Sequence, residues 1–104
     1  MLIKGIDASE IAPGGMKKVT VDGKPVVICN YEGIFYAVEQ RCSHLGASLE
    51  MGTLDGYILT CPLHYAQFDI RTGRTLSGPV PVDPQHPTAD LVSFKVELAD
   101  AAGQ

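Results

Sequence analysis

The chain has 104 residues, and 12 Asp or Glu against 8 Lys or Arg give it a formal net charge of −4. A chain of this length forms one domain with a modest core and is too short to form a second domain. The acidic balance, with no basic patch, argues against nucleic acid and anionic membranes as partners.

Short runs of β-branched and aromatic residues predict a series of strands. The 11 Gly and 7 Pro favour short strands and turns over long helices. The first expected element is one helical turn over residues 7–12, with Asp7 as its cap and Glu10 three residues later. A hairpin follows, because Asp22-Gly23 lies between two β-branched runs and suits the positive φ of a type I′ turn. The expected strands cover residues 17–21, 25–29, 34–38, 57–60, 68–70 and 91–97.

Two segments are expected to be irregular. Residues 78–88 hold four prolines and form a loop, and residues 99–104 fray. The sequence therefore predicts the all-β fold class, with one small antiparallel β domain that spans residues 1–104.

The chain also carries signals about its compartment. It has a charge at Lys4 and no run of 18 apolar residues, so neither a signal peptide nor a membrane anchor is expected. We therefore expect a cytoplasmic protein. In a reducing compartment, an odd count of three Cys, with His nearby, indicates a metal site before a disulfide.

Two short clusters combine Cys with His. The first is Cys42-x-His44 and the second is Cys61-x-x-His64, with residues 45–60 between them. Residues two apart in an extended loop point the same way, so Cys42 and His44 can converge. Pro62 suits the tight turn that brings Cys61 and His64 together. Two such loops facing each other supply four metal ligands.

The generic interpretation of two Cys and two His is a structural zinc site. Structural zinc motifs usually place Cys with Cys and His with His, whereas here each cluster holds one of each. That arrangement matches a Rieske [2Fe–2S] centre, in which two His replace two Cys on one iron.

The chain resembles the Rieske-type [2Fe–2S] ferredoxins that serve bacterial aromatic-ring-hydroxylating dioxygenase systems. Beyond the two clusters, the resemblance is carried by Phe68-Asp69, by the Thr72-Gly73 turn and by Gly78-Pro79. It covers nearly the whole chain and implies a Rieske-like β domain with a two-loop cluster-binding subdomain. The cluster-binding loops would lie at about residues 41–47 and 60–68, with a proline loop at about 77–82.

The resemblance also implies the ligand set. Cys42 and Cys61 would hold the inner iron, and His44 and His64 would hold the outer iron of one [2Fe–2S] cluster per chain. The core of the oxidised cluster carries about +2, so two thiolates and two neutral imidazoles leave the site neutral, which favours accepting an electron.

The implied function is that of a monomeric one-electron carrier. It would receive electrons from a flavin-dependent NAD(P)H reductase and pass them to a terminal Rieske oxygenase in aromatic hydrocarbon catabolism. The chain is not expected to be an enzyme, because only His86 remains for a second, catalytic iron site. The alternatives are a small Rieske subunit of another redox enzyme, such as nitrite reductase, and a zinc-stabilised interaction module.

Four residues predict a low redox potential. High-potential respiratory Rieske proteins have an extra disulfide where this chain has Ala47 and Leu63. They also have a Ser at the place of Ala66 and a Tyr at the place of Phe68, each donating a hydrogen bond to a cluster sulfur. Fewer donors stabilise the reduced, more negative cluster less, so we expect the low end of roughly −150 to +300 mV.

Other residues near the clusters also carry expectations. Tyr65 follows the second cluster where the family usually has Gly, so the backbone or the packing there is expected to differ. Leu45, Pro62 and Pro79 are expected to form an apolar rim around the cluster. Cys29, in an apolar run, is expected to be a buried, inert thiol.

Overall fold

The computed structural model describes residues 2–43, 46–63, 65–81, 84–85 and 88–98. These residues form short strands and two turns of 3-10 helix, which confirms the expected all-β class. In chain order the elements are β1 (Leu2–Ile6), η1 (Ala8–Glu10), β2 (Met16–Val21), β3 (Lys24–Tyr31), β4 (Ile34–Glu39), η2 (Leu49–Met51), β5 (Thr53–Asp55), β6 (Ile58–Thr60), β7 (Gln67–Asp69), β8 (Thr75–Ser77) and β9 (Ser93–Leu98).

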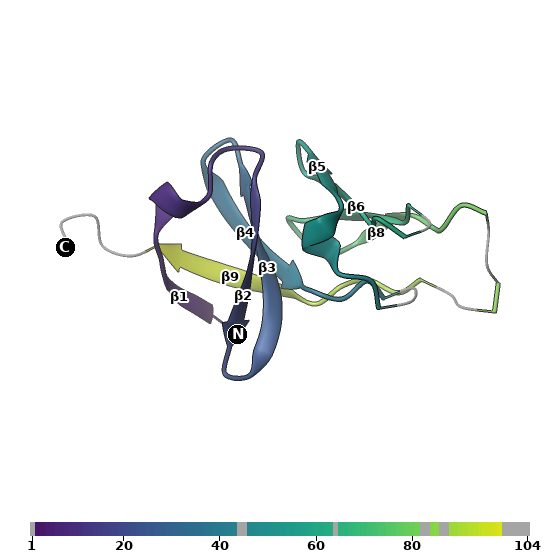
Figure 1. The fold of residues 1–104 in the computed structure, drawn as a ribbon, viewed down its shortest axis with the longest axis horizontal. Helices are drawn as coiled ribbons and strands as arrows, with labels where there is room; N and C mark the ends of the chain where they lie inside the picture. The colour runs from purple at the N-terminus through teal and green to yellow at the C-terminus, as the bar shows by residue number, and fades with distance from the viewer. Residues whose placement is uncertain (1, 44–45, 64, 82–83, 86–87, 99–104) are drawn as a thin grey trace.

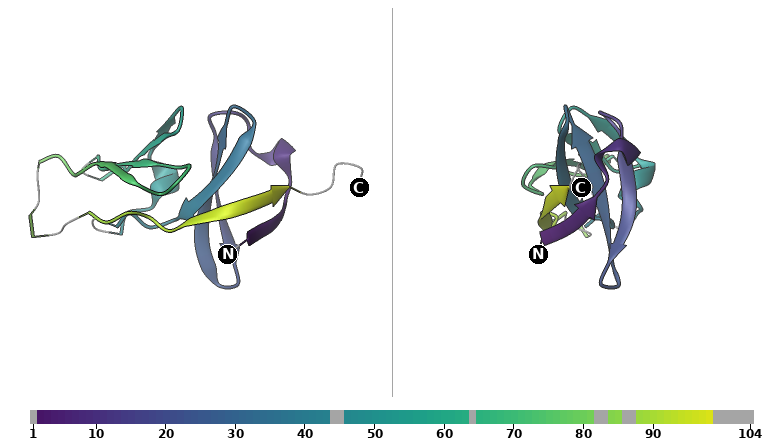
Figure 2. Two further views of the ribbon diagram at one scale, coloured as in Figure 1. Left: turned by 180° about the vertical axis from the view of Figure 1, so that it is seen from behind. Right: turned by 90° about the vertical axis from the view of Figure 1, so that its left-hand side faces the viewer.

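The strands form two sheets that follow one another along the long axis of the molecule (Figure 1). The larger sheet has the order β1-β9-β4-β3-β2, and the smaller has the order β5-β6-β7-β8. The segment after β8 extends to one end of the molecule, whereas β1 lies towards the other end (Figure 1). In Figure 2, β9 runs from the side of the smaller sheet back to β1.

Neighbouring strands are antiparallel, as expected, except that β1 and β9 pair in parallel. The sequence did not predict β1, and its backbone explains why. Gly5 has φ +79, and the register shifts between Lys4 and Ile6, so the apolar side chains of this strand do not alternate. The first strand then joins the last at the edge of the larger sheet.

The predicted hairpin is confirmed. Asp22 and Gly23 have φ values of +50 and +79, as a type I′ turn requires, and they connect β2 to β3. Glu32 and Gly33, with φ +52 and +88, make a second two-residue connection, from β3 to β4. Tight turns of this kind explain why three consecutive strands lie side by side in the larger sheet.

The remaining differences from the sequence prediction concern short elements. The helical turn is limited to η1, and the Asp7 carboxylate caps it by accepting from the Ser9 backbone N–H at 2.9 Å. The sequence does not predict the three-residue strands β5 and β8. Among the described residues, no helix is long and apolar enough to cross a membrane.

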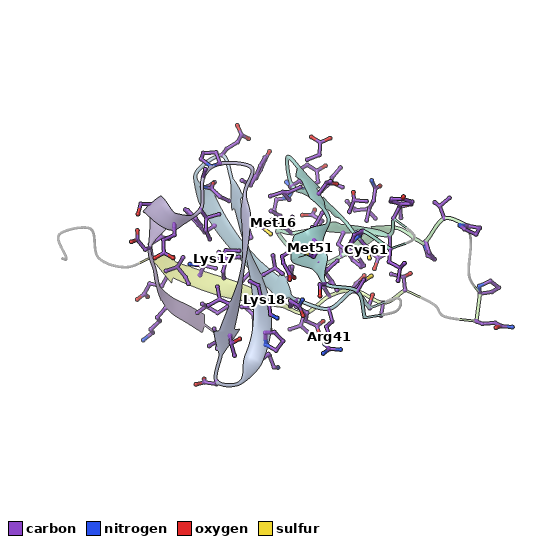
Figure 3. The ribbon with its side chains drawn as sticks, in the orientation of Figure 1. Met16, Lys17, Lys18, Arg41, Met51 and Cys61 are labelled. Atoms are coloured by element: carbon purple, nitrogen blue, oxygen red, sulfur yellow. The ribbon has the colours of Figure 1, made fainter. Side chains whose placement is uncertain are left out.

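The β3–β4 hairpin separates two cores. One core fills the space between the larger and the smaller sheet, and its buried members are Val27, Cys29, Val38, Cys42, Leu49, Leu59, Cys61, Ala66, Phe68, Ile70 and Leu91. Met16 packs against this core, at the seam between the two sheets (Figure 3). The other core lies on the opposite face of the hairpin, with the buried members Ile3, Ile11, Val26, Ile28, Ala37 and Phe94.

Candidate metal centre

Two loops that begin with cysteine close in the same way. Cys42 follows β4, and its backbone N–H donates to the carbonyl of Ala47 at 2.8 Å. Cys61 follows β6, and its backbone N–H donates to the carbonyl of Ala66, also at 2.8 Å. In each loop the closing alanine therefore lies five positions after the cysteine.

The backbone conformation also repeats between these loops. The residue before the closing alanine is Gly46 in the first loop and Tyr65 in the second, and both are left-handed, with φ +75 and +63. For a residue with a side chain, this conformation costs about 1–2 kcal/mol. The expected departure at Tyr65 is therefore not a change of backbone: the tyrosine adopts a conformation that suits glycine.

The two cysteine thiols lie in one buried core. Cys42 is 3% exposed and Cys61 is 1% exposed, and both are free thiols. The neighbouring Cys42 thiol also raises the pKa of Cys61, though less than burial does, whereas the Leu63 backbone N–H lowers it. Burial raises the pKa of Cys61 to about 11, so ionising this thiol inside the core requires a nearby cation. A bound metal supplies that cation and deprotonates its thiol ligands.

The first loop is also fastened to the far end of the chain. The Ser43 hydroxyl accepts from the backbone N–H of Ala89 at 3.1 Å and donates to the carbonyl of the same residue. This contact joins the loop to the segment that leads into β9. No sequence pattern predicts it, because its two residues are 46 positions apart.

An ion pair holds the turn between β7 and β8. The Asp69 carboxylate, at the end of β7, accepts from the Arg71 backbone N–H at 2.8 Å, from Nε at 3.0 Å and from Nη2 at 2.9 Å. These hydrogen bonds hold the pKa of Asp69 below its usual value. The Arg71 guanidinium stacks 3.8 Å from the ring centroid of Tyr57, and Tyr57 meets Tyr31 of β3 edge-on at 6.0 Å. The pair thus connects the smaller sheet to the larger one.

The model of the Rieske [2Fe-2S] domain family matches residues 2–95. The chain belongs to this family. Its members carry a Rieske-type [2Fe–2S] cluster, so the two buried thiols are explained by a cluster rather than by zinc. The family match covers both sheets and both cysteine loops.

Curated relatives agree with this assignment. The ferredoxin component of the naphthalene 1,2-dioxygenase system of Pseudomonas putida is 40% identical over 83 residues, which cover 77% of this chain and 80% of the relative. The ferredoxin component of biphenyl 2,3-dioxygenase of Rhodococcus jostii is 35% identical over 78 residues, covering 75% of this chain and 73% of the relative.

Solved structures share the fold. A chain from a complex of reduced oxygenase and oxidised ferredoxin in carbazole 1,9a-dioxygenase has a TM-score of 0.76 and 33% identity. The match covers 95% of this chain and 85% of that one. The ferredoxin of carbazole 1,9a-dioxygenase from Nocardioides aromaticivorans has a TM-score of 0.79 and 26% identity, covering 95% and 89%.

The described part of the site fits a Rieske cluster. Two cysteines buried in one core suit the inner iron of such a cluster. His44 and His64, the expected ligands of the outer iron, lie outside the described residues. The expectation that Cys29 is a buried thiol is confirmed: it is 0% exposed, and burial raises its pKa to about 12.

The expected apolar rim is only partly correct. Pro62 is exposed, but Pro79 is buried, and Leu45 lies outside the described residues. Leu63 and Tyr65 are instead exposed, at 43% and 62%.

Proposed function

We propose that this protein is a one-electron carrier of a ring-hydroxylating dioxygenase system and catalyses no reaction of its own. It takes electrons from a flavin-dependent NAD(P)H reductase and passes them to a terminal Rieske oxygenase. The observation that carries the proposal is the pair of thiols buried in one core, on two matched loops of a Rieske domain. Relatives that cover most of this chain are named ferredoxin components of such systems, which supports the same role.

The ligand assignment is part of this proposal. Cys42 and Cys61 hold the inner iron, and His44 and His64 hold the outer iron. The burial of both cysteines in one core supports the first half of the assignment. The Cys-x-His and Cys-x-x-His spacing, in which each loop supplies one sulfur and one nitrogen, supports the second half.

The partners and the compartment follow from the electron path. A related chain, at 33% identity, comes from a complex of oxygenase and ferredoxin, so we propose the terminal oxygenase as the electron acceptor. A reductase that draws on NAD(P)H works in the cytoplasm, where the free thiol of Cys29 also stays reduced. We propose that the carrier is a monomer there, because it has to leave one partner to reach the next.

Electron paramagnetic resonance spectroscopy of the dithionite-reduced protein tests the proposal. We expect a rhombic signal with a mean g value below that of all-cysteine clusters, because two imidazoles bind one iron. Cys42→Ser and Cys61→Ser are expected to lose the signal and the iron. Cys29→Ser, the matched control, is expected to keep both.

Three results would contradict the proposal. A colourless protein that binds zinc would indicate an interaction module. A cluster that survives Cys42→Ser or Cys61→Ser would refute the ligand assignment. A red-brown protein that elutes only as part of a larger enzyme would indicate a fixed subunit, such as that of a nitrite reductase, rather than a diffusing carrier.

A further inference from the structure

The second cysteine loop has a tyrosine at the position where the first cysteine loop has a glycine. Gly46 and Tyr65 occupy the same place, four residues after the cysteine and one before the alanine that closes the loop. Both have left-handed backbones, with φ +75 and +63. Glycine adopts this conformation freely, but a residue with a Cβ does not. Tyr65 is therefore a costly residue for the stability of this loop.

The side chain does not offset that cost by burial, because Tyr65 is 62% exposed. It has exposed apolar neighbours in the chain: Leu63, two residues earlier, is 43% exposed. Val80 is 62% exposed and follows β8, whose Ser77 pairs with Gln67 at the start of β7. The chain thus leaves β8 at the same end of the smaller sheet where the second loop enters β7. We call Leu63, Tyr65 and Val80 the apolar patch.

The segments that carry this patch are uncharged. Residues 61–67 and 75–81 contain no Asp, Glu, Lys or Arg, although 20 of the 104 residues of the chain are charged. The cores of protein interfaces are depleted of charge and enriched in aromatic residues, and tyrosine is among the commonest hot spots. Strain at an exposed residue, beside a proposed cluster ligand, indicates a functional constraint on that residue.

We propose that Tyr65 is the aromatic anchor by which this carrier docks on its terminal oxygenase, inserting into an apolar recess beside the electron acceptor. The inference rests on the proposed function. The oxygenase is the proposed docking partner because a related chain, at 33% identity, comes from a complex of oxygenase and ferredoxin. In the docked complex one electron leaves the reduced cluster of this protein, and the oxidised oxygenase gains it.

Stopped-flow spectroscopy tests this inference without a substrate. The dithionite-reduced holoprotein, freed of excess reductant, is mixed anaerobically with the oxidised oxygenase of the naphthalene 1,2-dioxygenase or carbazole 1,9a-dioxygenase system. The variants are Tyr65→Gly, which suits the left-handed backbone, and Tyr65→Phe, which keeps the ring. Met51→Ala is the control, because Met51 is 72% exposed in η2, outside the patch.

We expect Tyr65→Gly to raise the concentration for half-saturation about tenfold while its limiting rate and its midpoint potential stay at the wild-type values. Tyr65→Phe and Met51→Ala are expected to stay within about twofold. The thermal midpoint of Tyr65→Gly is expected to rise, because the loop loses its strained residue. The half-saturation of the wild type is expected to change less than about twofold between 50 and 300 mM NaCl, because the patch carries no charge.

The outcomes separate the anchor from the carrier function. If the wild type reduces an oxygenase and Tyr65→Gly saturates at the same concentration, the anchor is refuted. If Tyr65→Gly instead weakens only the reaction with the reductase, Tyr65 does not dock on the oxygenase and the inference is refuted. If the wild type has a Rieske signal but reduces neither oxygenase, the proposed function falls, and the inference that rests on it falls too.

Discussion

Replacing Arg71 tests how strongly the turn between β7 and β8 is held. The Asp69 side chain is 11% exposed, and the Arg71 side chain is 43% exposed. Arg71→Ala removes the two guanidinium hydrogen bonds, at 3.0 and 2.9 Å, and leaves a nearly buried carboxylate with only a backbone donor from residue 71. It also removes the stacking of the guanidinium on Tyr57.

The magnitude follows from these contacts. A hydrogen bond to a charged group contributes about 1.5–3 kcal/mol when buried, and we halve this for each bond because Arg71 is partly hydrated. The stacking on Tyr57 adds about 0.5–1 kcal/mol. We expect Arg71→Ala to lower the free energy of unfolding by about 2–4 kcal/mol, which corresponds to a fall of roughly 10–30 °C in the thermal midpoint of a small domain.

Thermal unfolding of the holoprotein, followed by circular dichroism and by cluster absorbance at one heating rate, measures the effect. Arg74→Ala is the matched control, because this exposed arginine lies in the same turn without an ion pair to Asp69. It is expected to change the free energy of unfolding by no more than about 0.5 kcal/mol. The double variant Asp69→Asn/Arg71→Ala is expected to lose less than the sum of the single variants, because both changes remove one interaction.

The pH dependence of stability shows whether the charged Asp69 carboxylate stabilises the fold. Arg71 holds the pKa of Asp69 below its usual value in the folded state. A lowered carboxyl pKa stabilises the fold at every pH above the unfolded value of about 3.9, and this contribution is lost as the pH falls through the folded pKa. The difference between wild type and Asp69→Asn is therefore expected to be constant from pH 7 to about 5 and to close below about 4. Wild-type stability in Arg71→Ala, or a difference that widens in acid, would refute this reasoning.

Three further predictions concern single residues. Ala66→Ser introduces a hydroxyl into the buried core that holds both cysteines. Voltammetry is expected to show a midpoint potential higher by on the order of 40 mV, equivalent to about 1 kcal/mol. A lower potential would contradict the low-potential argument. Gly73→Ala places a Cβ 2.1 Å from the Leu91 carbonyl oxygen, so it is expected to lower the free energy of unfolding in urea by at least about 3 kcal/mol. Gly14→Ala is the control, because Gly14 has the same φ of +83 but lies in open space; it is expected to lower the free energy of unfolding by about 1 kcal/mol. The Cys29 thiol has a pKa of about 12 and is 0% exposed, so native holoprotein is expected to resist iodoacetamide at pH 8 at this residue and to react there only after denaturation, as peptide mass analysis would show.

The sequence predicts those parts of the molecule whose signal is local. The β-branched runs on either side of Asp22-Gly23 predict two strands and their turn, and both turn residues have the positive φ that this requires. The spacing of Cys42 and Cys61 predicts a shared metal site, and the two cysteines lie in one buried core. In both cases the residues that decide the structure are neighbours in the chain or belong to a recognisable motif.

The parts that the sequence does not predict depend on distant residues. The parallel pairing of β1 joins Leu2 to Lys95, across almost the whole chain. The Ser43 contact needs Ala89, and no composition or periodicity connects those two positions. The strand β8 pairs with only two residues of β7, so the sheet rather than the propensity of its three residues defines it.

The placement of β1 towards the end of the molecule away from the segment that follows β8 has a practical consequence (Figure 1). A covalent tether on the exposed Lys4 of β1 would orient an immobilised monolayer with the cysteine loops facing the solution. Such a film would deliver electrons to a dissolved partner while exchanging them slowly with the conducting support beneath. A tether on Val80, converted to Cys, would reverse the orientation and give fast exchange with the support.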